Sequence, residues 1–558
     1  MKNRYFAFFA SAFLLLSLPG AGQDSGQKIT LRLMGDSTMA DKDLSGQNPE
    51  RGWGQRLPSH LDTSVCVVNY AQNGRSTKSF ISRGLWDRVK SDLRPGDWLF
   101  IQFGHNDSKA DDPERYAPAF GEYQENLRLF IDFALGKGAR PVLFTPVSRR
   151  WFGSDGKLKK DCHGDYPEAV FQVAREYGVP VVDANTITQE WLESIGDEAS
   201  RRYYMWIEKG TCPRHPDGLE DNTHTNVAGA RKLVELLLPA IVEVIPELGS
   251  HVVDYDFVVA KDGSGDFFTV QEAVDAAPDY CKQDETRIRI REGVYREKLT
   301  IPSNKEKLHL TGDDPVKTVI SWDDYALKKG STGHEMGTSA TSTVFLHAND
   351  FLAENLTFEN SAGDSKEIAQ ACAITVNGDR VAFINCRFIA NQDTVYTFGP
   401  GQRQFFRGCW IEGTTDFIFG FSTAWFEECT IMSKKNSYVT AASTPQGQEW
   451  GYVFSNCRLI HDRKATRVYL GRPWRPYART VFIGCELGDH ILREGWHNWD
   501  KPDAEKTSFY AEYGNYGPGA ASRDERVPWA HFLKPRQLAD YTPENVLGPS
   551  EEWYFNVF

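Results

Sequence analysis

The stretch VAFINCRF at residues 381–388 recurs along the second half of the chain. Its copies are QFFRGCWI at 404–411, AWFEECTI at 424–431, YVFSNCRL at 452–459 and TVFIGCEL at 480–487. Each copy has a Phe three residues before a Cys, and FLAENLTF at 351–358 is a weaker copy with Leu in place of Cys. Short strands that repeat every 20–30 residues or so, without helices, are typical of solenoids. The pattern therefore predicts an all-β domain, a right-handed parallel β-helix.

The repeat also explains half of the ten cysteines. Stacked coils place equivalent residues above one another, so we expect an inward ladder of small apolar side chains: Cys386, Cys409, Cys429, Cys457 and Cys485. No CxxC pair occurs, which argues against a structural zinc site. Cys162 and Cys212, both in irregular segments of the first half, could pair, and the sequence leaves this open.

Residues from about 29 to 248 follow another pattern, in which strand-like and helix-like segments alternate. The strand-like runs are Ile29–Met34, Val65–Asn69, Trp98–Phe103, Pro141–Thr145 and Val179–Val182, and the helical patterns are Tyr123–Leu135, Glu168–Tyr177 and Val227–Ile245. Such alternation predicts a three-layer α/β domain with a parallel sheet, whose ligands lie beyond the carboxyl ends of the strands. A chain of 558 residues exceeds one compact core, so we predict two domains, at 29–248 and 252–558.

The first residues have the pattern of an export signal. Lys2 and Arg4 precede an apolar run from Phe6 to Leu18, and small residues follow at 20–22. The run is too short to span a bilayer, which predicts a signal peptide over residues 1–22, a secreted or periplasmic protein, and no membrane contact after cleavage. The formal net charge of −13 argues against a nucleic-acid partner, because phosphate binding requires a cationic surface.

Three polar motifs of the first half contain the parts of a serine hydrolase. GDST at 35–38 follows the first strand, GHND at 104–107 follows another strand, and DNTH at 221–224 precedes the last helix. A serine hydroxyl needs a base to take its proton and a carboxylate to orient that base, roles that Ser37, His224 and Asp221 can fill. Each motif alone is typical of a turn or a capped loop.

A developing oxyanion also needs fixed hydrogen-bond donors. The backbone N–H groups of Ser37 and Gly74 and the side-chain amide of Asn106 can supply them. His105 is a rival candidate for the base. We expect it to lie beside Asn106 rather than beside a carboxylate that could orient it.

Taken in this order, the motifs resemble those of the SGNH (GDSL-like) hydrolase family across nearly the whole first half. GDSTMA at 35–40, GRS at 74–76 and GHND at 104–107 look most like its rhamnogalacturonan acetylesterase branch. The resemblance implies a flavodoxin-like fold and an acetyl esterase with the roles just given. Relatives that act on xylan or another acetylated glycan would share these motifs, so the acetylated sugar stays open. Asn106 also begins a formal glycosylation sequon, and a glycan there would block catalysis, which favours a bacterial source.

Polar residues of the second half recur at the spacing of the coils. Asp416, in TTDFIF, lies about one coil beyond Asp393, and Arg472 lies about two coils further. Stacking can therefore make the two carboxyls neighbours, and Asp416, flanked by apolar residues, needs a charged partner such as Arg472. Adjacent carboxyls push their pKa values apart, which leaves an ionised nucleophile and a protonated acid. The structural alternative is that Asp416 caps a turn and Arg472 neutralises it.

GVYRE at 293–297, QDTVY at 392–396, DFIFG at 416–420 and LGRPW at 470–474 resemble the pectin methylesterase family, from about Phe257 to about Asn545. The resemblance implies these site residues: Asp416 as nucleophile, Asp393 as general acid/base, Gln370 and Gln392 as oxyanion donors, Arg472 as the partner of Asp416, and Trp474 and Tyr396 as walls of a sugar cleft. Thr415 stands where the family commonly has Val, a conservative change.

Together the resemblances predict a bifunctional enzyme that removes methyl and acetyl esters from pectic polysaccharide without a metal or cofactor. One rival is a β-helical pectate lyase or polygalacturonase. A lyase would require a Ca²⁺ site with a basic residue, and a glycosidase would require carboxylates that flank a glycosidic bond. Neither explains Gln370 and Gln392. A second rival is a carbohydrate-binding module in one half, against which the intact candidate sets argue. Oligomeric state and domain packing stay open.

Overall fold

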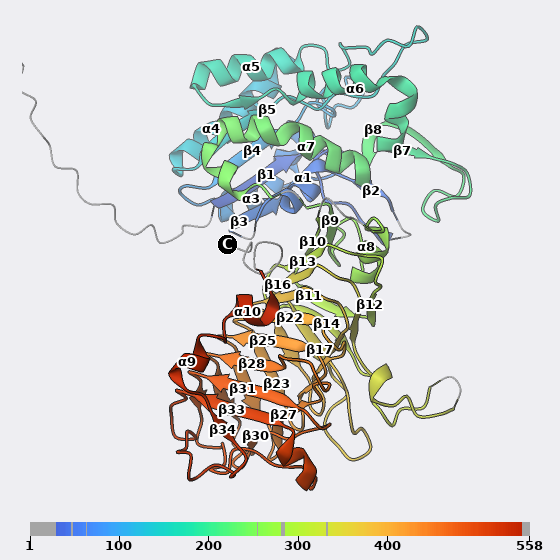
Figure 1. The fold of residues 1–558 in the computed structure, drawn as a ribbon. Helices are drawn as coiled ribbons and strands as arrows, with labels where there is room; N and C mark the ends of the chain where they lie inside the picture. Colours follow the sequence, from blue (N-terminus) through green and yellow to red (C-terminus); the bar gives the residue numbers. More distant parts are fainter. Residues whose placement is uncertain are drawn as a thin grey trace, which may run out of the picture.

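The computed structural model describes residues 29–45, 48–62, 64–253, 255–280, 285–330 and 333–549. The signal peptide predicted over residues 1–22 lies outside these ranges. Within them, no helix combines the length and the apolar character needed to cross a membrane. A body of layered helices and strands comes first along the chain, and a long stack of coils follows (Figure 1).

A five-stranded parallel sheet forms the centre of the first body, in the order β3-β1-β4-β5-β6. Its strands are β1 (Ile29–Gly35), β3 (Val65–Asn69), β4 (Trp98–Gln102), β5 (Arg140–Phe144) and β6 (Val181–Val182). This order, 2-1-3-4-5 when the parallel strands are numbered along the chain, is that of a flavodoxin-like fold. The predicted α/β architecture is therefore confirmed.

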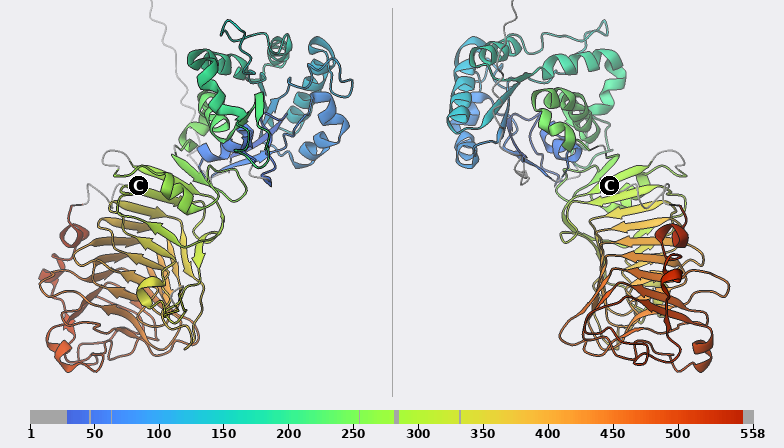
Figure 2. Two further views of the ribbon diagram at one scale, coloured as in Figure 1. Left: turned by 90° about the vertical axis from the view of Figure 1, so that its right-hand side faces the viewer. Right: turned by 60° about the vertical axis from the view of Figure 1, so that its left-hand side comes forward.

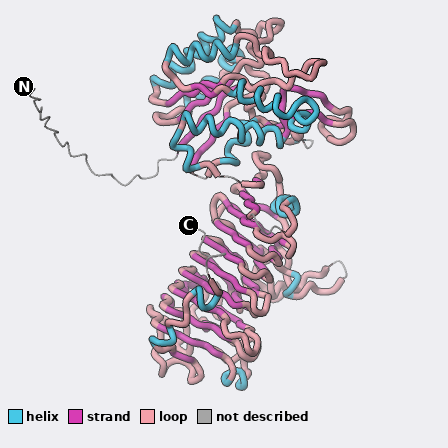
Figure 3. The backbone as a smooth tube through the Cα atoms, turned by 45° about the horizontal axis from the view of Figure 1, so that its top comes forward, coloured by secondary structure: helices cyan, strands magenta, loops and turns pink. Residues whose placement is uncertain are grey.

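Helices cover both faces of this sheet (Figure 3). One apolar cluster joins the sheet to α1 (Trp53–Arg56), α6 (Ala184–Ser200) and α7 (Val227–Val244), and the other joins it to α2 (Thr77–Ser82), α3 (Leu85–Asp92), α4 (Gln124–Gly136) and α5 (Tyr166–Tyr177). Successive residues of β4 enter opposite clusters, Phe100 the first and Leu99 and Ile101 the second, as the pleat of a strand requires. The helical patterns of α4, α5 and α7 are confirmed, whereas α2, α3 and α6 were not predicted.

A small sheet beside α7 holds the DNTH motif. Its strands are β2 (Glu50–Arg51), β8 (Leu219–Asn226) and β7 (Tyr204–Ile207), in the antiparallel order β2-β8-β7. Residues 221–224 therefore lie within strand β8. Asn226 then caps α7 by accepting the N–H of Gly229, so the motif leads directly into the last helix.

The second body is a parallel β-helix built from three sheets (Figure 2). The first contains β9 (Phe257–Val259), β10 (Thr286–Ile290), β13 (Leu308–Gly312), β16 (Phe351–Glu354), β19 (Val381–Ile384), β22 (Arg403–Arg407), β25 (Thr423–Glu427), β28 (Tyr452–Ser455), β31 (Arg479–Ile483), β33 (Phe509–Tyr513) and β34 (His531–Phe532). The second contains β11 (Gly293–Arg296), β14 (Thr318–Trp322), β17 (Thr357–Asn360), β20 (Arg387–Ile389), β23 (Trp410–Gly413), β26 (Thr430–Ser433), β29 (Arg458–His461) and β32 (Glu486–Leu487).

The third sheet carries the second candidate site. It contains β12 (Leu299–Ile301), β15 (Val344–Leu346), β18 (Ile374–Val376), β21 (Val395–Thr397), β24 (Ile418–Gly420), β27 (Tyr438–Ala442) and β30 (Tyr469–Gly471). Only three short α-helices accompany the described coils: α8 (Val270–Ala276), α9 (Pro535–Leu538) and α10 (Pro543–Leu547). This agrees with the near absence of helical periodicity after residue 252.

The repeated Phe forms a continuous stack through the interior of the β-helix. Phe406 pairs in register with Phe383 on one side and with Phe426 on the other. The ring of Phe426 lies 4.6 Å from that of Phe406 and 4.4 Å from that of Phe454, with interplanar angles of 14° and 8°. Each coil thus supplies one ring to a shared core, which explains why the repeat keeps Phe at this position.

The repeated Cys forms the predicted ladder beside the Phe stack. All five thiols are free and at most 1% exposed. Each donates to a backbone carbonyl of the preceding coil, as Cys409 does to Phe383 at 3.3 Å and Cys429 to Phe406 at 3.5 Å. Burial raises the pKa of Cys386 to about 12, so this thiol stays protonated and unreactive. Cys162 is also a free thiol, so the pairing with Cys212 that the sequence left open is not formed.

Buried arginines join the two bodies. Arg56, which is fully buried, forms a 2.7 Å ion pair with Asp266, and Arg51 donates to the carbonyl of Gly263 at 2.9 Å. A buried guanidinium costs free energy unless its donors are satisfied, and here the turn that enters the β-helix accepts from both terminal nitrogens of Arg56, through the carbonyl of Ser264 and the carboxylate of Asp266. The contact is therefore a built interface rather than a flexible tether.

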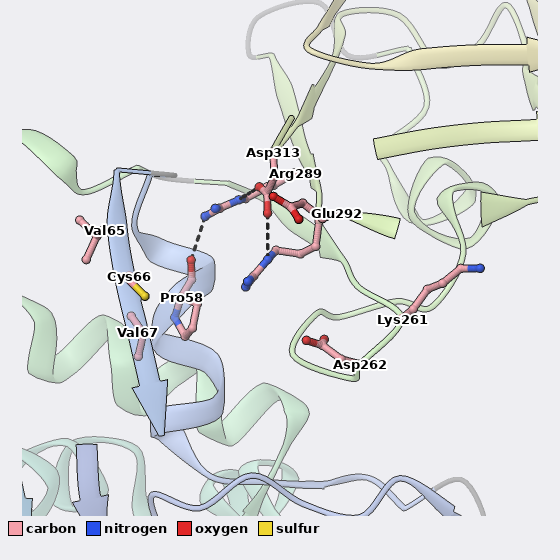
Figure 4. A pocket seen from close by; sticks show the side chains of 10 residues that line it. Pro58, Val65, Cys66, Val67, Lys261, Asp262, Arg289, Glu292 and Asp313 are labelled. Carbon is pink, nitrogen blue, oxygen red and sulfur yellow. Dashed lines mark hydrogen bonds and ion pairs between the residues drawn. The ribbon is translucent and has the colours of Figure 1, made fainter. Parts of the chain in front are cut away.

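A hollow of about 420 Å³ lies at the same junction, beside β3 and the end of β10 (Figure 4). Arg289 donates to the carbonyl of Pro58 at 2.8 Å and pairs with Asp313 at 2.7 Å. Arg291 pairs with the second oxygen of Asp313 at 3.0 Å. The charges in the hollow largely compensate one another, which suits a structural contact between the bodies.

Two candidate active sites

The structure brings the predicted serine, histidine and aspartate together at the carboxyl end of β1. The Nε2 atom of His224 lies 2.8 Å from Oγ of Ser37, and Nδ1 of His224 lies 2.7 Å from Oδ2 of Asp221. The other oxygen of Asp221 accepts the backbone N–H groups of Thr223 and His224. The carboxylate is therefore held by three donors, and it orients the imidazole toward the serine.

The environment of Asp221 keeps this carboxyl ionised. Burial raises its pKa, but the hydrogen bond and charge of His224 and the backbone donors outweigh burial and hold the pKa at about 2. A carboxylate facing Nδ1 favours the tautomer with its proton there, which leaves Nε2 to accept the proton of Ser37. The arrangement is competent for general-base activation of a serine.

The proposed oxyanion donors line the same cleft as Ser37. Gly74 and Asn106 both border this cavity of about 270 Å³. Gly74 has a φ of 70°, a left-handed conformation that suits glycine. The amide nitrogen of Asn106 donates to the carbonyl of Arg75 at 3.0 Å, and its oxygen accepts from Lys109 at 3.0 Å. Hydrogen bonds thus hold both the nitrogen and the oxygen of this amide, as a preorganised oxyanion donor requires.

The reason given against His105 as the base is wrong. Its Nδ1 lies 3.1 Å from Oδ2 of Asp36, so a carboxylate does orient this ring. The sequence spacing gave no sign of this, because the contact crosses from the end of β1 to the end of β4. His105 and Asp36 are buried, and burial lowers the pKa of His105. The hydrogen bond to Ser37 belongs to His224, which keeps the role of candidate base.

Lys42 is a contributor that sequence reasoning missed. Its buried ammonium donates to the carbonyl of Ser37 and to Oδ1 of Asn73, and it forms a 2.7 Å ion pair with Glu50. It thereby ties the serine turn to the loop that carries Gly74. No motif marks Lys42, and its role depends on three contacts that only the folded chain creates.

The carboxyl pair of the second body lies on consecutive coils. Strand β21 pairs with β24 so that Val395 lies opposite Ile418, which places Asp393 beside Asp416 two residues before each strand. Both aspartates have left-handed backbones, with φ of 66° and 49°. Conformations of this kind are costly for residues other than glycine, and the same backbone recurs at other coil turns of this β-helix, as at Asn385 and Asn456.

Arg472, just after β30, holds Asp416 through two parallel hydrogen bonds. Its Nε donates to Oδ1 at 2.9 Å and its Nη2 donates to Oδ2 at 2.6 Å. The guanidinium carbon lies 3.9 Å from the ring centre of Tyr438 and 3.6 Å from that of Trp499. The fork geometry and the flanking rings fix the cation, as is typical of arginine at a carboxylate site.

The two carboxyls have different environments. Burial raises the pKa of Asp393 well above its usual range, and the charge of Asp416 raises it further. Burial also raises the pKa of Asp416, but there the guanidinium of Arg472 opposes the effect. These environments favour Asp393 as the carboxyl that keeps a proton and Asp416 as the one that ionises.

All the predicted residues of the second site border one cavity of about 390 Å³: Gln370, Gln392, Asp393, Tyr396, Asp416, Arg472 and Trp474. Sequence reasoning missed Phe419 and Trp499, which border it too. Phe419 lies opposite Tyr396 in the strand register, with ring centres 4.3 Å apart. The spacing of the coils would therefore have been enough to predict that Phe419 borders this cavity. Trp499 follows β30 in a loop without a motif, and only the fold brings it onto Arg472.

Three further side chains could hold a metal ion. Ligand atoms of His461, Asp489 and His490 all lie within 4.8 Å of one another. Nδ1 of His461 bonds the carbonyl of Asp462 at 2.7 Å, which leaves Nε2 facing Asp489. None of the three borders either cleft.

Two protein families match the chain. The pectinesterase family matches residues 256–550, and the GDSL-like lipase/acylhydrolase family matches residues 33–232. Pectinesterase 31 of Arabidopsis thaliana is 38% identical over 301 residues, which are 53% of this chain and 92% of that protein. Pectinesterase 4 of the same plant is 41% identical over 316 residues, which are 54% of this chain and 52% of that protein.

A solved structure extends the comparison to the fold. Pectin methylesterase from carrot is 35% identical, with a TM-score of 0.50, and the match covers 54% of this chain and 95% of that one. The families and the carrot structure set aside a lyase or a glycosidase as the identity of the β-helix. The chain therefore belongs to the pectinesterase family of carboxylic ester hydrolases and carries, ahead of its right-handed parallel β-helix, a GDSL-like acylhydrolase region.

Proposed function

We propose that the protein is a bifunctional pectin-deesterifying enzyme with one activity in each of two domains, residues 29–248 and 252–558. The observation that carries the proposal is the presence of two complete and separate nucleophile sets. One is Ser37 with His224 at 2.8 Å, and the other is Asp416 with Arg472 at 2.6 Å. The β-helix removes methyl esters, and the α/β domain removes acetyl esters from the same class of polysaccharide.

For the methyl ester, the carboxylate of Asp416 attacks the carbonyl carbon. The amides of Gln370 and Gln392 donate to the oxyanion that forms. The intermediate collapses to an acyl-enzyme anhydride while Asp393 gives its proton to the leaving methoxide, which departs as methanol. Asp393 then takes a proton from water, and the resulting hydroxide attacks the polymer carbonyl, which restores the Asp416 carboxylate and frees the polymer as a carboxylic acid that loses its proton to solvent.

For the acetyl ester, Oγ of Ser37 attacks the acetyl carbonyl as Nε2 of His224 takes its proton. The N–H groups of Ser37 and Gly74 and the Asn106 amide stabilise the oxyanion. The imidazolium gives this proton to the departing sugar oxygen, which leaves as a hydroxyl. Water, activated by the same imidazole, then hydrolyses the acetyl-serine and releases acetate.

Aromatic side chains support a sugar polymer as the substrate of the second site. Tyr396 and Trp474 border the cavity that holds the carboxyl pair, and aromatic faces pack well against sugar rings. The relatives of this half are named pectinesterases. Rhamnogalacturonan is the acetylated pectic polysaccharide that the first half's motifs favour.

The experiment is to measure methanol and acetate released from methylated, acetylated pectin by the wild type, Ser37→Ala and Asp416→Ala. We expect Ser37→Ala to lose only acetate release and Asp416→Ala to lose only methanol release. If the wild type binds the polymer but releases neither product, the protein is a carbohydrate-binding protein and both assignments fall. If one product is missing, the corresponding domain acts only in binding.

We also propose that a bacterial cell exports this enzyme. Lys2, Arg4 and the apolar run from Phe6 to Leu18 support a cleaved signal. Expression with the native start should give an exported protein whose amino terminus, found by mass spectrometry, lies near residue 23. Retention of Met1 in the mature protein would contradict the proposal.

A further inference from the structure

Cations gather at the cleft that holds Ser37 and His224. Lys109, Arg115 and Arg149 all border it, and the one acidic residue of its lining, Glu50, is paired with Lys42. The whole protein has a net charge of −13, so this local excess of positive charge does not follow from the composition. Clefts of one sign concentrate ligands of the opposite sign.

Two of these cations lack a carboxylate partner within the described residues. Arg115 pairs with Asp112, but Lys109 and Arg149 form no ion pair with a described acidic side chain. Nη2 of Arg149 donates to the carbonyl of His105, and its buried Nε has no partner in the described chain. Burial lowers the pKa of Lys109, the charges of Arg115 and Arg149 lower it further, and the charges of Asp112 and Asp111 oppose them in part.

An exposed aromatic face lies beside Arg149. The indole of Trp151 is 41% exposed, and the guanidinium carbon of Arg149 lies 5.1 Å from its ring centre. A flat apolar face next to a fixed cation suits a sugar ring that carries an acidic group, because the ring packs on the indole while the acid reaches the guanidinium. Asp36 and Asp221 act on Arg149, and Asp112 and Asp111 act on Lys109, only from beyond ion-pair distance, so a neutral acetylated glycan such as xylan would leave both cations without a direct carboxylate partner.

We propose that the Ser37 cleft binds a free carboxylate of the polymer through Arg149 and Lys109, and therefore removes acetyl groups preferentially from uronate stretches whose methyl esters are already gone. The inference rests on the proposed acetylesterase function and adds the charge of its substrate. It also gives an order of action. Hydrolysis of a methyl ester yields methanol, a proton and a carboxylate, so an ester hydrolase such as the β-helix must first create the group that this cleft binds.

The test compares three acetylated oligosaccharides: a galacturonate oligomer as the free acid, the same oligomer as its methyl ester, and a neutral xylose oligomer. The Asp416→Asn variant of the full chain is the parent enzyme, because it cannot convert the ester into the acid during the assay. We expect kcat/KM for acetate release to be about tenfold higher for the free acid than for the methyl ester, the size of one charge-assisted hydrogen bond. Added salt should reduce this preference.

Single substitutions test which residues cause the preference for the free acid over the methyl ester. Arg149→Gln and Lys109→Gln, each in the Asp416→Asn parent, should bring the ratio of free acid to methyl ester close to one. Arg175→Gln is the matched control, because Arg175 is a surface cation of the same domain, 65% exposed and paired with Glu168. It should leave the ratio unchanged.

The outcomes separate the two levels of the proposal. Equal rates on acid and ester, or a faster rate on the ester, would overturn the carboxylate site while the acetylesterase function stands. A preference that survives both variants would overturn the assignment to Arg149 and Lys109. Failure to release acetate from any of the three oligosaccharides and from the acetylated pectin of the first experiment would instead overturn the acetylesterase function itself.

Discussion

The Nε2 atom of His224 lies 2.8 Å from Oγ of Ser37, although 187 residues separate the two in the chain. The serine comes from the end of β1, and the histidine comes from β8 of the small antiparallel sheet. The reactive pair therefore forms only when two elements from opposite ends of the sequence of the first body pack together.

Replacement of Asp221 by Asn should abolish the orientation of His224 without removing the imidazole. An amide at this position can donate to Nδ1 and stabilise the wrong tautomer, so we expect kcat for acetate release to fall by about 10³- to 10⁴-fold. Ser37→Ala combined with Asp221→Asn should be little worse than Ser37→Ala alone, because the residues act as a unit. Methanol release by the same samples is the control. An equal loss of both products would point to misfolding instead.

Replacement of Arg472 by Met should change the pH dependence of methanol release. Without the guanidinium, burial raises the pKa of Asp416 with only the charge of Lys501 left to oppose it, so the nucleophile ionises only at higher pH. The acidic limb of the kcat/KM profile should therefore move to higher pH, with a lower maximum. The alkaline limb reports the loss of the proton from Asp393, whose pKa is raised by burial and by Asp416. An acidic limb that stays in place would show that Arg472 does not control the ionisation of Asp416.

Deprotonation of Asp107 should lower the free energy of unfolding of the first body as the pH rises. Burial raises its pKa to about 7 against the opposing bonds from Thr77, and its Oδ2 has no partner among the described residues. The folded state therefore binds a proton that the unfolded state has already lost, and stability falls between about pH 4 and pH 7. Asp107→Asn keeps the acceptor for Thr77 and removes the titration.

Thermal unfolding of Asp107→Asn and wild type over a pH series checks this prediction. The advantage of the variant should grow from pH 4 to pH 7 and then stay level, and it should reach at most about 4 kcal/mol. Asp111→Asn, in the adjacent loop, is the control. A difference in stability that is constant with pH would refute the titration of Asp107.

Removal of one ring from the aromatic stack should destabilise the β-helix. Phe426 lies between Phe406 and Phe454 at 4.6 and 4.4 Å, so Phe426→Ala leaves a cavity in the centre of the core. We expect a loss of about 3–5 kcal/mol in the free energy of unfolding. Cys429→Ser in the same coil keeps the bond to the Phe406 carbonyl and should cost far less. Unfolding in denaturant, followed by loss of methanol release, measures both, and similar losses would argue against the stack as the main support.

The sequence predicted features that repeat along the chain or that form short continuous motifs beside a strand. The coil spacing was enough to place Asp393 beside Asp416, because stacking in a parallel β-helix turns a sequence period into a lateral distance. The coil spacing did not predict the position of Trp499, because this residue lies in a loop that is not part of the repeat and that folds back over Arg472. Asp36 was missed for a related reason, since its contact with His105 joins two strand ends whose order in the sheet the sequence does not state. Helix α6 was not predicted because Gly196, with a φ of 77°, interrupts its helical periodicity.

The arginines buried between the two bodies limit how a substrate can pass from one cleft to the other. To swing the bodies apart, the protein would have to expose Arg56 and break its pair with Asp266 and its bond to the carbonyl of Ser264. The two clefts therefore keep a constant mutual orientation during turnover. Under the proposed bifunctional activity, transfer between them depends on the polymer sliding or rebinding, so the spacing of esters along the polysaccharide, rather than a hinge in the protein, would set which groups are processed together.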